Sequence, residues 1–149
     1  IENGRKEAGK IPSRSVLLHK CIYEKYPHVN SIIIAHPFNI MTFAVTDVPF
    51  DSRTIPESYI LLRDIPKIPF GSSFMQPAMV ADLFKPQTPI VLVENDCVIV
   101  TGSSLLNAYD RLEVAEFSAR ALIDAKSLGD VIEINDEQIN DLKKAFRLD

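Results

Sequence analysis

The 149-residue chain lacks any apolar run long enough to cross a bilayer, so we expect no helical membrane span. It also lacks an excess of basic residues. The formal net charge is -4, and neither nucleic acid nor an anionic membrane is an expected partner. Cysteine is scarce, and Cys21 and Cys97 stand in apolar surroundings without metal-type spacing. This usage indicates buried thiols in a reducing compartment. No secretory leader is visible, and we expect a cytoplasmic protein.

What is present is the composition of a soluble globular domain, with 46% hydrophobic and 24% charged residues. No repeat, low-complexity tract or linker divides the chain, which predicts one α/β domain over residues 1–149. The chain begins at Ile1 within a predicted turn at residues 2–4, and this start suggests a fragment of a longer protein.

Short apolar runs alternate with helical patterns. Strands are predicted at 32–35, 90–93 and 97–101, the last two as a hairpin whose Asn95-Asp96 turn lacks the usual glycine. Helices are predicted at 14–26 with Ser13 as the cap, 38–45, 72–85, 104–128 between Ser103 and Gly129, and 136–146 after Asn135 or Asp136. The proline-rich stretch 46–69 is expected to be an irregular excursion with brief strands.

The strand at 32–35 stops at His36, and Pro37 prevents it from continuing as an inner strand. A titratable side chain at the end of a buried strand is typical of a functional position. The alternative is a histidine that serves only to hydrogen-bond the strand end.

One face of the long predicted helix carries charged residues, and we expect this face to be solvated. Within it the Glu113 and Glu116 pair is expected to face solvent or an interface rather than to act as an acid–base couple. The remaining charged positions on this face are Asp110, Arg111 and Arg120.

Several motifs occur in a characteristic order: Pro12-Ser13 before a helix with His19 and Tyr23, His36-Pro37, Pro69-Phe70-Gly71-Ser72, and Gly102-Ser103-Ser104-Leu105. In this order they resemble the class II aldolase/adducin family. The alternation of elements alone suggests a parallel sheet. The resemblance implies instead a three-layer α/β/α fold with a central, largely antiparallel sheet, which we adopt. It also implies that about the first third of a full-length member is missing here.

The resemblance implies a metal-assisted chemistry. In the family a divalent ion, usually zinc, is held by three histidines and stabilises an enediolate, while a glutamate moves the proton. In this chain the first histidine position is Ile34, the second is His36, the third is Asp96, and the glutamate position is Ser15. Isoleucine has no lone pair, and a serine hydroxyl is not a carboxylate base near neutral pH. His36 and Asp96 are therefore a vestigial or altered pair of metal ligands.

Other positions carry weaker implications. Ser13 matches a phosphate-contacting serine, and Arg14 beside it favours an anion, although Ser13 serves equally well as a helix cap. Tyr59 stands where some family aldolases place a tyrosine that protonates substrate in a neighbouring subunit, and simple packing is its alternative. The family also implies a homo-oligomer, commonly a cyclic tetramer.

Two classes of function remain open. The first is a binding or assembly module without the zinc-dependent aldol cleavage, similar to the head domain of adducin, with no cofactor. The second is a metal-dependent lyase, epimerase or dehydratase that acts on a small phosphorylated sugar and uses zinc or another divalent cation at a rebuilt site around His36 and Asp96. A weaker third possibility is a small-anion binder that uses Ser13 and Arg14.

Overall fold

The computed structural model describes residues 8–148, so the turn predicted at residues 2–4 lies outside it. The described strands form one four-stranded sheet in the order β1-β4-β3-β2. Strand β4 is antiparallel to β1 and β3, whereas β2 is parallel to β3. The α/β class is confirmed, but the sheet is mixed rather than purely antiparallel. The strand bounds are β1 Ser31–Ala35, β2 Lys67–Ile68, β3 Ile90–Val93 and β4 Val98–Gly102.

The parallel pair arises because the chain passes from β2 to β3 through two short helices, and such a crossover returns the chain in the same direction. These helices are α4 (Ser72–Met75) and α5 (Pro77–Ala81). A single helix was predicted over residues 72–85. It is interrupted at Gln76, whose extended φ of −138° precedes Pro77 at the first position of α5.

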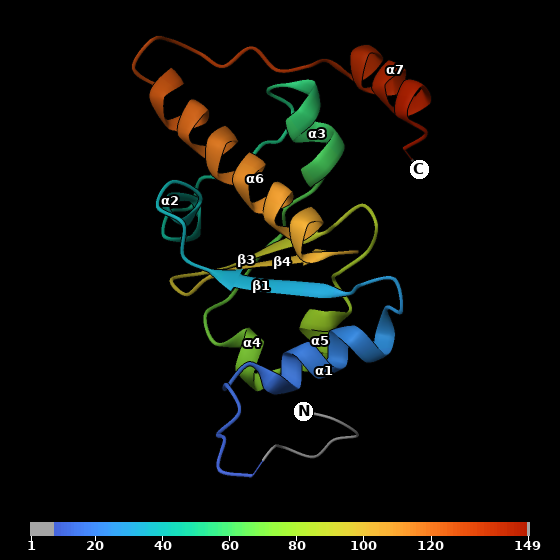
Figure 1. Cartoon of the computed structure of the whole chain (residues 1–149). Coiled ribbons are helices and arrows are strands. Elements are labelled where there is room, and N and C mark those ends of the chain that lie inside the picture. The colour runs from blue at the N-terminus through green and yellow to red at the C-terminus, as the bar shows by residue number, and fades with distance from the viewer. Residues whose placement is uncertain (1–7, 149) are drawn as a thin grey trace.

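Helices cover both faces of the sheet (Figure 1). On one face lie α1 (Val16–Lys25), α4 and α5; on the other lie α2 (Ile40–Ala44), α3 (Pro56–Leu62) and α6 (Leu105–Ala125). Alternate residues of a strand point to opposite faces, and each face therefore has its own core. The core under α1 and α5 includes Val91, Val93 and Ile99, and the core under α6 includes Ile90, Leu92, Val98 and Val100.

Helix α6 lies very close to the sheet because the residues between them are small. Ala108, Ala115 and Ala119 are fully buried along the inner side of the helix. A Cβ atom added at Gly102 would lie only 2.5 Å from the backbone nitrogen of Ala108. The end of β4 therefore requires glycine for contact with the first turn of α6.

Several helices differ from the sequence prediction. Helix α1 begins at Val16 with Ser15 as its N-cap, and no side chain caps it, so the cap expected at Ser13 is wrong. Helix α6 begins after Ser104, which accepts a hydrogen bond from the amide of Asn107, and it ends at Ala125, three residues before the predicted end. Helix α3 lies within the stretch that was expected to be irregular; Pro56 occupies its first turn, where the missing N–H has no cost.

The β3–β4 hairpin forms although its turn has no glycine. Asn95 takes a left-handed conformation with φ of 52°. Asparagine adopts this conformation more readily than other non-glycine residues. The amide of Val93 donates to the carbonyl of Cys97 at 2.8 Å and closes the turn.

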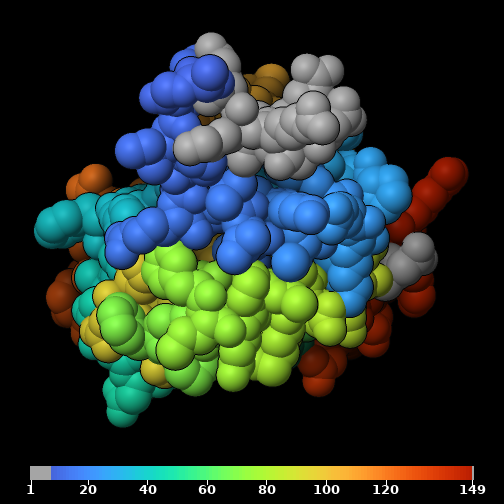
Figure 2. Space-filling view, turned by 90° about the horizontal axis from the view of Figure 1, so that it is seen from below, coloured from blue at the N-terminus to red at the C-terminus, as the bar shows by residue number. Residues whose placement is uncertain are grey.

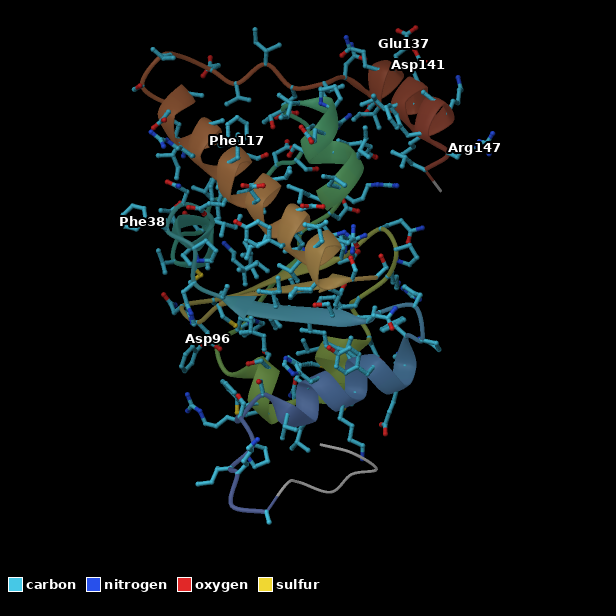
Figure 3. The ribbon with its side chains drawn as sticks, in the orientation of Figure 1. Phe38, Asp96, Phe117, Glu137, Asp141 and Arg147 are labelled. Atoms are coloured by element: carbon cyan, nitrogen blue, oxygen red, sulfur yellow. The ribbon has the colours of Figure 1, made fainter. Side chains whose placement is uncertain are left out.

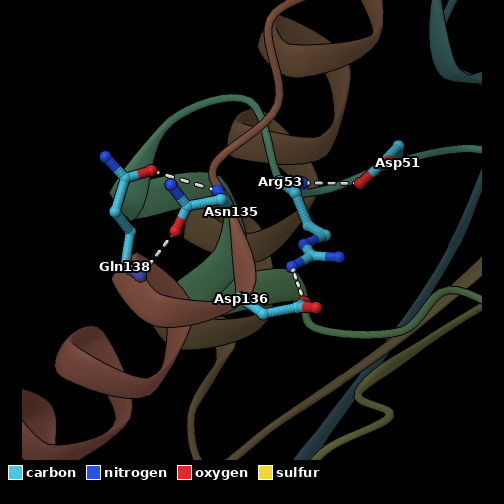
Figure 4. Close-up of polar contacts among 5 residues, drawn as sticks. All are labelled: Asp51, Arg53, Asn135, Asp136 and Gln138. Carbon is cyan, nitrogen blue, oxygen red and sulfur yellow. Dashed lines mark hydrogen bonds and ion pairs between the residues drawn. The ribbon is translucent and has the colours of Figure 1, made fainter.

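Helix α7 (Asp136–Phe146) packs beside α3 at the C-terminal end of the described chain. The predicted cap is confirmed: Asn135 and Gln138 form a reciprocal capping box (Figure 4). Arg53 forms an ion pair with Asp136, and its own amide donates to Asp51 at 2.8 Å. Within residues 8–148, no helix combines the length and apolar character that a membrane span requires.

Glu116 is not solvent-facing, which corrects the prediction for this face of α6. Its carboxylate accepts hydrogen bonds from the amide of Asn39 (2.9 Å), the side-chain amide of Asn39 (2.7 Å) and the amide of Ile40 (2.9 Å). It thus satisfies the free N–H groups at the start of α2 from a distant part of the chain. Arg111 is also half-buried, and its guanidinium donates to the carbonyl of Thr101 at 2.6 Å.

We expect Glu116→Gln to lower the free energy of unfolding by about 1–3 kcal/mol, because hydrogen bonds to a charged acceptor are lost and α2 loses its N-terminal partner. Urea denaturation followed by circular dichroism measures the change. The matched control is Glu113→Gln on the exposed side of the same helix, which should change stability by less than about 0.5 kcal/mol. Equal losses in the two variants would contradict the assigned role of Glu116.

Candidate functional site

The register of β1 and β4 brings two sequence-predicted residues together. Ala35 pairs with Val98 in the antiparallel ladder. The next pair of this antiparallel register, after Ala35 and before Val98, is His36 and Cys97. Asp96 directly precedes Cys97 in the hairpin turn. Figure 3 shows Asp96 below β1, on the side of the sheet where α1 and α4 pack.

The segment before α1 closes the site from the other side. Ser13, Arg14 and Ser15 lead into the helix, and His19 follows Ser15 by four residues, which places both on one side of α1. A cavity of about 410 Å³ lies between these residues, the end of β1 and the start of α4. Figure 2 shows the molecule from the side of the sheet that these helices cover, where α1 in blue lies directly against α4 and α5 in green. The residues that line the cavity are Ser13, Arg14, Ser15, Leu18, His19, Ile34, His36, Ser73, Phe74, Asp96 and Cys97.

The cavity therefore contains all four of the candidate phosphate and metal positions: Ser13, Arg14, His36 and Asp96. Ser15 and Ile34, which the resemblance assigns to the positions of the family's glutamate and first histidine, also line it. Tyr59 does not. It lies on α3 across the sheet, lines a separate cavity of about 250 Å³ and packs under the guanidinium of Arg63. Its role across a subunit boundary stays a prediction.

Three residues of the cavity wall were not predicted from the sequence to belong to the site: Ser73, Phe74 and His19. The signal for Ser73 was the Gly71 turn that precedes it: Gly71 adopts φ of 80° as the N-cap of α4, and this turn directs the next residues toward the hairpin. The signal for His19 was its helical spacing from Ser15. Phe74 had no distinguishing signal, and it lies under Arg14, whose guanidinium carbon is 5.2 Å from the ring centroid.

Burial sets the protonation of two groups in the cavity. Burial raises the pKa of the Cys97 thiol to about 12, and the neighbouring Asp96 carboxylate adds to the effect. Burial also lowers the pKa of His19, whose Nε2 atom is buried without a hydrogen-bond partner in the described chain. At neutral pH the cavity thus contains a thiol rather than a thiolate, together with a neutral His19 ring.

Comparison with known proteins identifies the family. The family profile described as "Class II Aldolase and Adducin N-terminal domain" matches residues 1–123. The chain therefore belongs to the class II aldolase and adducin N-terminal domain family.

Individual relatives agree with this assignment. The L-fuculose phosphate aldolase of Methanococcus vannielii is 28% identical over 120 residues, which cover 76% of this chain and 64% of that protein. The chain thus spans less than two thirds of that relative's length. A solved L-fuculose 1-phosphate aldolase superposes with a TM-score of 0.78 at 19% identity, covering 96% of this chain and 68% of the other. The YgbL protein of Klebsiella pneumoniae superposes with a TM-score of 0.74 at 23% identity, covering 91% and 68%.

The residues in this cavity do not fit the divalent ion that the family implies. Ile34, which the resemblance assigns to the first ligand position, has a hydrocarbon side chain without a lone pair. Among residues 8–148, no three side chains of the His, Cys, Asp or Glu types gather in a way that could hold a metal ion.

Cys97 should be unreactive in the folded protein, because it is buried and the thiolate is the reactive form. In a Cys21→Ser variant, Ellman's reagent at pH 8 should modify less than about a tenth of the remaining thiol in the time that consumes a free thiol. The same variant in denaturant should react completely. Rapid reaction under native conditions would contradict the burial of Cys97.

His19 should make the folded state less stable in acid. Its pKa is lower in the folded state than its ordinary value of 6.5, so below pH 6.5 the unfolded chain binds more protons. Stability is therefore retained above pH 6.5 and declines as the pH falls toward the folded pKa. Urea midpoints between pH 5 and 8 should decline less for His19→Gln than for the unmodified chain. For the control His28→Gln, at an exposed position, the urea midpoint should decline with falling pH as much as it does for the unmodified chain.

Proposed function

We propose that this chain is a family member without the zinc-dependent aldol cleavage and acts as a binding or assembly module. The observation that carries the proposal is the wall of the 410 Å³ cavity. At the position of the family's base stands Ser15, and at the positions of two of the three metal ligands stand Ile34 and Asp96. All three side chains line the place where the chemistry would occur.

Each replacement removes a capability that the reaction requires. Serine in place of glutamate leaves a hydroxyl, which is not a proton-accepting base near neutral pH. Isoleucine in place of histidine removes a coordinating lone pair and adds apolar surface. The cavity itself persists, with Arg14 at its mouth and with hydroxyl and imidazole groups along its walls. These features support binding of a small polar ligand more than they support carbon–carbon bond cleavage.

The second candidate is a metal-dependent lyase, epimerase or dehydratase on a small sugar phosphate. It is favoured by one observation: His36 and Asp96 line the same cavity as Ser13 and Arg14. In this alternative the missing ligand comes from a second subunit of a homo-oligomer or from a segment outside this chain. The relatives named as L-fuculose phosphate aldolases indicate which substrate to test first.

Metal analysis separates the two candidates. The purified chain is dialysed against a ten-fold excess of zinc or manganese, then against metal-free buffer, and its metal content is measured. We expect well below one ion per chain, and no aldehyde release from L-fuculose 1-phosphate. Stoichiometric metal that is lost in His36→Ala and Asp96→Ala but retained in His28→Ala would overturn the proposal and support the lyase.

A further inference from the structure

Two opposite charges stand in the cavity without a charged partner. The Arg14 guanidinium is exposed at the mouth and stacks on Phe74. Asp96 is half-buried in the hairpin turn; its carboxylate accepts a hydrogen bond from the Ser73 hydroxyl at 3.5 Å and interacts with the Cys97 thiol. Neither forms an ion pair with the other or with any residue in 8–148. Lys25 and Asp82, which join α1 to the end of α5, do form an ion pair.

The groups around Asp96 are suited to a cation with hydrogen-bond donors. The carboxylate of Asp96 accepts several hydrogen bonds, and the hydroxyl of Ser73 offers a further acceptor; His36 lines the same cavity. An ammonium group has three N–H donors and needs only such acceptors, whereas a transition-metal ion needs a closed set of three or more ligands. The donor set therefore fits an organic ammonium better than a metal ion.

The groups at the mouth of the cavity are suited to an anion. Arg14 offers several N–H donors, and the hydroxyl groups of Ser13 and Ser15 lie beside it, 3.0 Å from each other. A ligand with negative charge alone would share the cavity with the Asp96 carboxylate and would be repelled by it. A ligand with both charges satisfies both ends. Leu18 and Ile34 also line the cavity and offer apolar contact for a short carbon chain.

We infer that this cavity binds a small zwitterion, with a phosphate or carboxylate at Ser13 and Arg14 and a primary ammonium at Asp96 and His36. The inference rests on the proposed function, because it assumes that the cavity holds an organic ligand rather than a metal ion. It adds the chemical class of the ligand and assigns Asp96 as the residue that selects it.

Three matched probes test the inference: phosphoethanolamine has both charges, ethyl phosphate lacks the ammonium, and ethanolamine lacks the phosphate. Calorimetric titration at constant ionic strength should give phosphoethanolamine at least a ten-fold lower Kd than either of the others. β-Alanine, tested in the same way, shows whether a carboxylate replaces the phosphate. Equal affinity for phosphoethanolamine and ethyl phosphate would overturn the inference.

Two variants assign the ends of the ligand. Asp96→Asn should weaken phosphoethanolamine binding about ten-fold while ethyl phosphate binds as well as before or more tightly, because a repulsive charge is removed. Arg14→Gln should weaken the binding of both phosphoethanolamine and ethyl phosphate. The control Asp130→Asn, in the exposed segment between α6 and α7, should alter neither. Circular dichroism and the thermal midpoint verify that each variant is folded, and the comparison of probes on the unmodified chain stands without any variant.

The outcomes also separate this inference from the proposed function. If ethyl phosphate binds as tightly as phosphoethanolamine and no metal is found, the zwitterion inference is wrong, but the proposed function as a binding module is still supported. Stoichiometric metal on His36 and Asp96, with no affinity for phosphoethanolamine, overturns both. Selective binding of phosphoethanolamine that is lost in Asp96→Asn supports both.

Discussion

Strand β4 is the element on which the rest of the structure depends. It is buried along its whole length and pairs antiparallel with β1 on one side and β3 on the other. Its alternate side chains enter the two separate cores, and Gly102 at its end allows α6 to approach. Backbone groups buried in this way must be paired within the sheet, so the register of β4 is strongly constrained.

The candidate site follows from that constraint. Because β1 and β4 are antiparallel and in register at Ala35 and Val98, the residues just beyond both strands share one edge of the sheet. The hydrogen-bonded pairing of β1 with β4 places three residues at this edge, whatever contacts their side chains make: His36, Asp96 and Cys97. Helix α1 then covers this edge and adds Ser15 and His19. The scaffold persists whichever side chains occupy these positions, and this independence explains how the ligands can differ while the frame is retained.

The binding properties depend on charge and burial more than on shape. Arg14 and Asp96 carry opposite charges and form no ion pair within residues 8–148, while Cys97 and His19 are neutral at pH 7 because burial disfavours their charged forms. The cavity is thus lined by charged and hydroxyl-bearing side chains together with the apolar side chains of Leu18 and Ile34.

Much of the fold could be predicted from local patterns. The apolar runs at 32–35 and 90–93 are strands, the capping box at Asn135 is present, and the order of the Pro12-Ser13, His36-Pro37 and Gly102-Ser103 motifs led to the correct family. These features depend on neighbouring residues in the chain, whose effects are readable from sequence. Where two local signals competed, prediction failed: Pro77 divided a helix, and Ser15 rather than Ser13 preceded α1.

By itself, the sequence determined three of the four strands, the long helix α6, the C-terminal helix α7 and the family. Only the tertiary structure decided the parallel pairing of β2, the burial of Glu116 against Asn39, and the assembly of Ser73 and His19 with Asp96. The reason is physical: each of these depends on contacts between residues far apart in the chain. Such contacts depend on how whole helices and strands pack together, and the periodicity of neighbouring residues in the sequence does not predict that packing.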